Sequence, residues 1–181
     1  MRSLFLFLVL FGATPCWSDT KEALIRSIED AGTNDYQDER HSVEIDGCQI
    51  TTYRWRDRPD HGWVLWSSFQ FDMVDAVLTA NKGKSKERYL YARLEAGPPE
   101  IGFAIIPFKM QEGTFARFER TVLRPSTELT RPSPRNDGKS HYFQKSDDFF
   151  IGHEGPDVAQ KATAFTQGFT RYVAEFCTFS S

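Results

Sequence analysis

A chain of 181 residues, 40% of them hydrophobic and 26% charged, has the balance of one globular domain and excludes a largely disordered protein. Removing the first 18 residues takes away Arg2 and no acidic residue, so the formal net charge falls from −3 to −4. This acidic balance argues against nucleic acid as the main partner, because phosphate binding depends on a concentrated basic face.

The N-terminal segment differs in composition from the rest of the chain. Arg2 is followed by an uncharged apolar run over residues 4–12, which is too short to span a bilayer. Small residues, Cys16 and Ser18, precede a cleavage point before Asp19. We expect residues 1–18 to be a signal peptide, and residues 19–181 to form a single α+β domain that is periplasmic or secreted. The alternatives are a buried apolar element and lipidation at Cys16.

Two cysteines remain after this cleavage, Cys48 and Cys177, and they lie 129 positions apart. An even number of cysteines in an oxidising compartment predicts a disulfide between them. The alternative is a pair of buried free thiols. No other apolar run approaches the roughly 20 residues of a transmembrane helix, so no membrane span is expected after cleavage.

The chain begins and ends with amphipathic patterns of helical period. A short helix is predicted over residues 19–31, with Asp19 and Glu22 as a capping pair, followed by a polar linker over residues 33–41. A longer helix begins near Pro156. The segments between them alternate polar and apolar residues and predict strands; these are residues 43–55, 63–71, 89–95, 101–108, 115–123, 141–145 and 149–152. Asp46 and Gly47 interrupt the first of these segments and predict a hairpin turn there.

The fold class follows from this order of elements. Strands joined by short turns pair antiparallel, because parallel crossovers need a dozen or more residues. We therefore expect an α+β fold, with a mainly antiparallel curved sheet of six to eight strands. An N-terminal helix and a longer C-terminal helix pack on this sheet. A basic loop over residues 79–88 and an exposed, mobile loop over residues 125–140 interrupt the strands.

The register of the hairpin that joins the strand ending at Trp55 to the strand beginning at Trp63 is left open. Pairing Trp55 with Trp63 places aromatic side chains on one face and Cys48 on the other, so either both faces are covered or a bulge near residues 51–53 switches the parity. The predicted disulfide draws the end of the terminal helix to the Cys48 face, with Phe169 packed against the sheet.

Motifs for the common hydrolases, metalloproteases, redox enzymes and phosphate-binding loops are missing from the sequence. Histidines next to acidic residues suggest an alternative, a small exported hydrolase or metal-dependent enzyme that uses His61, His153 and Glu154. Solvated turns and polar strand ends explain the same residues better. Whether the chain is an enzyme is left open, and no metal or cofactor is expected.

Arginine and tryptophan give the ligand-binding prediction. Arg54 and Arg56 share one face of a strand and could hold an anion, although such rows often only face solvent. Trp66 has the opposite parity to its apolar neighbours and is the tryptophan most suited to contact a ligand. We expect an extracytoplasmic binding or interaction protein, whose partner is an envelope protein or a small ligand.

Overall fold

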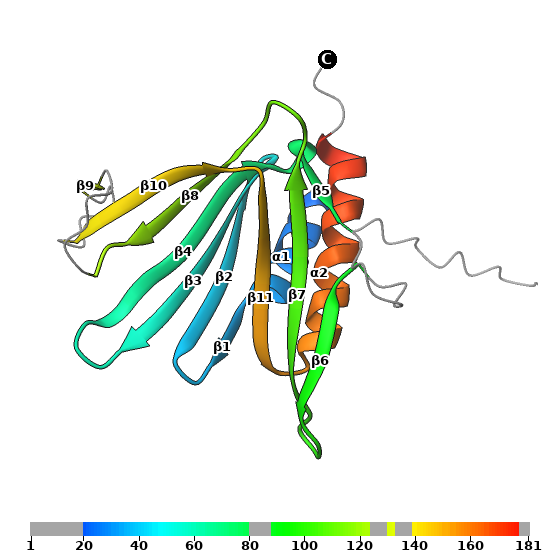
Figure 1. Cartoon of the computed structure of the whole chain (residues 1–181). Coiled ribbons are helices and arrows are strands. Elements are labelled where there is room, and N and C mark those ends of the chain that lie inside the picture. The colour runs from blue at the N-terminus through cyan, green and yellow to red at the C-terminus, as the bar shows by residue number, and fades with distance from the viewer. Residues whose placement is uncertain (1–19, 80–87, 124–129, 133–138, 178–181) are drawn as a thin grey trace, which may run out of the picture.

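The computed structural model of the chain describes residues 20–79, 88–123, 130–132 and 139–177 (Figure 1). The predicted signal peptide with Cys16 lies outside these residues. So do residues 80–87 of the predicted basic loop and most of the predicted loop over residues 125–140.

Helix α1 (Lys21–Gly32) has its N-cap one residue later than the sequence predicts. The hydroxyl oxygen of Thr20 accepts a hydrogen bond from the backbone N–H of Ala23, so Thr20 caps the helix, and Asp19 lies outside the described residues. The helix ends at Gly32, as the sequence predicts, but the reason is packing. A Cβ at Gly32 would lie 2.3 Å from a methyl group of Val43, so only glycine allows this close approach.

Most of the described chain forms antiparallel strands. The first group is β1 (Asn34–Tyr36), β2 (Glu39–Asp46), β3 (Gln49–Arg58), β4 (Gly62–Asp72), β8 (Ala116–Thr121), β9 (Thr130–Pro132) and β10 (Ser140–Ser146). They form a seven-stranded sheet in the order β1-β2-β3-β4-β8-β10-β9. The second group is β5 (Ala76–Leu78), β6 (Leu90–Glu95), β7 (Ile101–Met110) and β11 (Asp148–Pro156). They form a four-stranded sheet around β7. A single-turn 3₁₀ helix, Met73–Asp75, joins β4 to β5.

The predicted fold class is confirmed, and one predicted segment is wrong. Residues 33–41 are not a linker, because they form β1 and the start of β2. The residues that face inward here are Asn34 and His41, both buried, so hydrophobicity alone does not reveal the alternation. β1 also meets the second sheet, where the Asn34 amide donates to the carbonyl of Glu154 on β11.

Both helices lie on the same side of β7 and β11, as Figure 1 shows, and α2 (Val158–Tyr172) packs beside α1. Phe169 of α2 is 3% exposed, and its ring centroid lies 5.4 Å from that of Phe108 on β7. Ile28 of α1 fills the space beside Gly168. The helices and the inward faces of both sheets therefore share one hydrophobic core.

The disulfide between Cys48 and Cys177 is confirmed, with a Cα–Cα distance of 5.6 Å. It joins the β2–β3 turn to the π-helical turn that continues α2, Val173–Cys177. The hydroxyl of Tyr172 donates to the carbonyl of Gly47 at 2.7 Å, so the helix end is held at this turn twice. No helix in the described part of the chain is long and apolar enough to cross a membrane.

The register of the β3–β4 hairpin differs from the prediction. Trp55 pairs with Leu65, not with Trp63, and Arg54 pairs with Ser67. Trp66 is therefore an extra residue on β4, which is a β-bulge between those two pairs. The predicted parity switch exists, but it lies on β4 rather than near residues 51–53.

Candidate functional site

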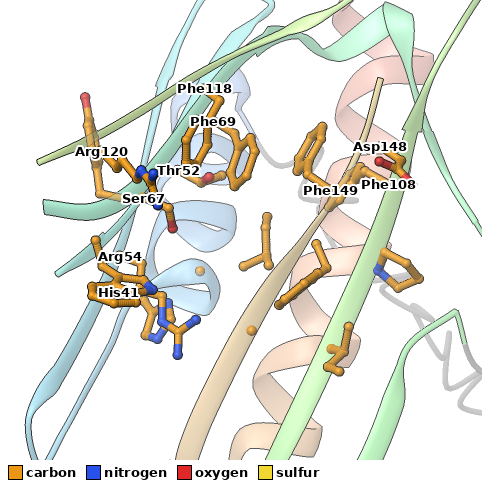
Figure 2. Close-up of a pocket in the computed structure, with 18 of the residues that line it drawn as sticks. His41, Thr52, Arg54, Ser67, Phe69, Phe108, Phe118, Arg120, Asp148 and Phe149 are labelled. Atoms are coloured by element: carbon orange, nitrogen blue, oxygen red, sulfur yellow. The ribbon is translucent and has the colours of Figure 1, made fainter. Parts of the chain in front are cut away.

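A cavity of about 1170 Å³ lies between the two sheets. Ligand pockets in proteins typically measure about 300–1,000 Å³, whereas packing voids larger than a water molecule are few. The space is therefore too large to be a packing defect. Figure 2 shows its walls: Thr52, Arg54, Ser67, Phe69 and Phe118 lie on one side, facing the strands that carry Phe108 and Phe149.

Phenylalanine rings form the apolar part of the wall. Phe69 and Phe118 are paired across β4 and β8, with ring centroids 5.2 Å apart, and Phe108 and Phe149 are paired across β7 and β11, also at 5.2 Å. Phe69 stacks on Phe149 at 4.6 Å and so joins the two pairs. A continuous row of aromatic rings thus connects one sheet to the other.

The strand period explains why the wall changes from apolar to polar. Alternate residues of a strand face the same side. On β3 the inward residues run from Ile50, which is buried in the core, through Thr52 to Arg54. On β4 they run from Phe71 through Phe69 to Ser67, each opposite its β3 partner. The same sheet face therefore begins as core and ends as a polar wall.

At the polar end, Glu39 on β2 is held by two arginines. The Arg54 guanidinium makes two hydrogen bonds to its carboxylate, at 2.7 and 2.8 Å, and Arg56 forms a further ion pair with it. Burial alone would raise the pKa of the Glu39 carboxyl, but contacts with His41, Arg54 and Arg56 hold that pKa well below its usual range. Glu39 is therefore ionised at neutral pH.

Two histidines meet at the same end. The rings of His41 on β2 and His153 on β11 have centroids 5.2 Å apart. Burial lowers the pKa of both imidazoles. The pKa of His153 falls to about 3, because the charges of His41 and Lys161 lower it further. Both imidazoles are therefore neutral at pH 7. His153 is 1% exposed, and neither ring nitrogen has a hydrogen-bond partner in the part of the chain described here.

The bulge places Trp66 at this end of the cavity, where it lines the wall. The guanidinium groups of Arg56 and Arg58 lie 4.8 and 4.6 Å from the centre of its ring, within cation–π distance. The three residues predicted to contact a ligand are thus gathered together. Arg54 and Trp66 line the cavity, and Arg56 contacts both Trp66 and Glu39.

The residues of the alternative site are not gathered in this way. His61 is exposed in the β3–β4 turn. Glu154 directly follows His153 on β11, so the side chains of His153 and Glu154 point to opposite faces of that strand. The carboxylate beside the histidine pair is Glu39, 3.3 Å from His41. Glu39 and His41 are not among the site residues that the sequence predicts. Their alternation with Val43 and Ile45 is the signal that could have found them.

The contacts of the remaining histidines complete the description of the site. Among the described residues, the only hydrogen-bond partner of His41 is Glu39. No group of three or more His, Cys, Asp or Glu residues within the described ranges is placed to hold a metal ion. His141 lies on the opposite sheet face, where its ring is 2.7 Å from Glu119.

The fold and the cavity together define an α+β protein with a large, partly aromatic cavity between its two sheets. Comparison of the chain with models of protein families, with curated proteins and with solved structures finds no match.

Proposed function

We propose that this chain is an extracytoplasmic binding protein, periplasmic or secreted, that holds a small apolar molecule in the cavity between its sheets. The observation that carries the proposal is the row of four phenylalanines along a cavity of about 1170 Å³. Covering apolar wall stabilises a complex by about 25 cal/mol per Å², and Phe69 and Phe118, which are half-buried, are the rings of this row that a ligand can cover.

Export is supported by the covalent structure. The disulfide between Cys48 and Cys177 is of a kind that persists in oxidising compartments and is rare in the cytosol. The intact mass of the protein recovered from the envelope or the medium tests this part of the proposal. We expect a chain that begins at Asp19, and retention of residues 1–18 would contradict it.

The binding proposal is tested with phenylnaphthylamine, a neutral dye that fluoresces in apolar surroundings. We expect saturable binding of one dye per chain. Ser67 lines the polar part of the wall, and Ser67→Trp fills part of the cavity, so this variant should bind the dye at least tenfold more weakly.

Gln70→Trp is the matched control, because Gln70 lies three positions further along β4, on the opposite face of the sheet. It adds the same side chain to the same strand and should leave dye binding unchanged. Equal binding by both variants would place the dye outside the cavity, and no saturable binding by the parent chain would contradict the proposed function.

A further inference from the structure

The charge at the polar end of the cavity is positive. Two guanidinium groups, of Arg54 and Arg56, face the single carboxylate of Glu39, and the adjacent His41 and His153 are neutral at pH 7. One positive charge therefore exceeds the negative charge in this cluster.

Three further charged side chains line the described part of the cavity, those of Lys109, Arg120 and Asp148. Lys109 and Asp148 are cross-strand neighbours of opposite charge, and Arg120 is a cationic side chain on the wall formed by the first sheet. Figure 2 shows Arg120 beside Thr52 and Ser67, on the same wall as Arg54.

Polar and apolar groups are separated along the cavity wall that the first sheet forms. The hydroxyls of Thr52 and Ser67 lie between the arginines and the phenylalanine row, so hydrogen-bond donors gather at one end. The other end is formed by Phe69, Phe118 and Phe149. A ligand that matches this wall has a charged group at one end and a hydrocarbon body at the other.

We infer that the ligand is an amphiphile with one anionic head group on an alkyl chain, with its head at Arg54 and its chain along the phenylalanine row. This inference rests on the proposed function and specifies the class of ligand. Carboxylates and phosphates share the required chemistry, because both accept paired hydrogen bonds from a guanidinium group.

Competition against bound phenylnaphthylamine tests the inference with three ligands of equal chain length: dodecanoic acid, dodecyl phosphate and dodecanol. We expect at least one of the two anions to displace the dye at a concentration about tenfold lower than dodecanol does. The anion that binds more tightly then identifies the head group. Equal displacement by all three would overturn the inference and leave the proposed function intact, whereas failure of the dye itself to bind would overturn the proposed function.

The length of the chain gives a second measurement. Each methylene group buried against apolar wall contributes about 0.8 kcal/mol, so affinity should rise about threefold to fourfold per added carbon, until the chain fills the cavity. Affinity that does not change between octanoic and dodecanoic acid would contradict binding along the phenylalanine row.

Arg54→Gln locates the head group. Glu39 keeps its ion pair with Arg56 in this variant, so no buried carboxylate is left without a partner. We expect the tighter anion to lose about tenfold in affinity and dodecanol to be unaffected. Arg93→Gln is the matched control. Arg93 lies on β6 and forms an exposed ion pair with Glu100, so this substitution removes the same charge away from the polar end of the cavity.

A second pair of variants keeps the inference testable if Arg54→Gln does not fold. Arg120→Gln removes a positive charge from the cavity wall, and Arg117→Gln removes one from the opposite face of the same strand, β8. We expect only Arg120→Gln to weaken the anion relative to dodecanol. Equal effects of the two variants would show that only the overall charge of the protein matters.

Discussion

Two regions of this protein use the same kind of side chain for different purposes. At the helix-covered end, Phe169 of α2 stacks on Phe165, and both are buried, so the space between sheet and helix is filled. Toward the other end, Phe149 stacks on Phe69, but the rings line a cavity. The difference lies in what covers the sheet, because both ends continue the same inward face of the strands.

This comparison separates stability from binding. A phenylalanine in the filled region loses all its contacts when it is truncated, whereas one on the cavity wall already has open space on one side. Substitutions in the filled region should therefore change the free energy of unfolding, and substitutions in the cavity should mainly change ligand affinity.

The largest expected effect is that of Phe169→Ala. Truncating a fully buried phenylalanine typically costs about 3–5 kcal/mol, while Phe118→Ala, on the half-buried cavity wall, should cost about 1 kcal/mol. Chemical denaturation of both variants measures the two values. Equal losses of stability would mean that the cavity wall is packed as tightly as the core.

Removing the disulfide is expected to have the next largest effect. The Cys48→Ala, Cys177→Ala double variant opens a loop whose ends are 129 positions apart, and removal of such a bridge typically costs about 2–5 kcal/mol. The end of α2 should loosen first, because the hydrogen bond from Tyr172 to Gly47 is then the one remaining link described here between this helix end and the β2–β3 turn. Hydrogen exchange that is faster in the sheet than in the last turns of α2 would be the opposite of this expectation.

Gly168→Ala tests the contact between the helices. In an isolated helix this change stabilises by about 1 kcal/mol. Here the new Cβ would lie 2.8 Å from a side-chain carbon of Ile28, which is fully buried and cannot move aside. Overpacking of this kind costs about 1–3 kcal/mol, so we expect a net loss of stability. A higher melting temperature for the variant would show that α1 can shift away from α2.

The sequence predicts the filled region well because local signals determine it. The period of the two helices, the Asp46–Gly47 turn and the even number of cysteines after cleavage each point to the observed elements. β1 was missed because its inward residue is Asn34, which is buried through its hydrogen bond to β11. A partner 120 positions away cannot be read from a local pattern.

The candidate site could be predicted only in part. Arg54, Arg56 and Trp66 were chosen from parity and charge, and they lie together, but their register was wrong because the bulge at Trp66 has no clear sequence signal. His41 and His153 belong to different sheets, so only the folded chain brings them together. The cavity is lined by strands of both sheets, so the pattern of a single strand does not reveal it.

A further expected effect concerns the dependence of stability on pH. Because burial lowers the pKa of His153 from 6.5 to about 3, the unfolded chain binds a proton that the folded chain does not. The stability from this group is complete above pH 6.5 and is lost as the pH falls from there toward 3. His153→Phe should therefore reduce the slope of stability against pH by about 1.4 kcal/mol per pH unit between pH 6 and 4.

Urea denaturation at several pH values measures these slopes. His61→Gln is the control, because His61 is exposed in the β3–β4 turn, and it should keep the slope of the parent chain. The same slope in the parent and in His153→Phe would show that His153 is not held neutral by the fold.

The central claim is that the space between the sheets holds an anionic amphiphile, and a crystal structure of the protein with ω-bromododecanoic acid tests it most directly. We expect one anomalous bromine peak inside the cavity, among Phe69, Phe118 and Phe149, and the carboxylate within hydrogen-bond distance of Arg54. Bromine bound only on the outer surface, with the cavity filled by the protein's own side chains, would contradict the account.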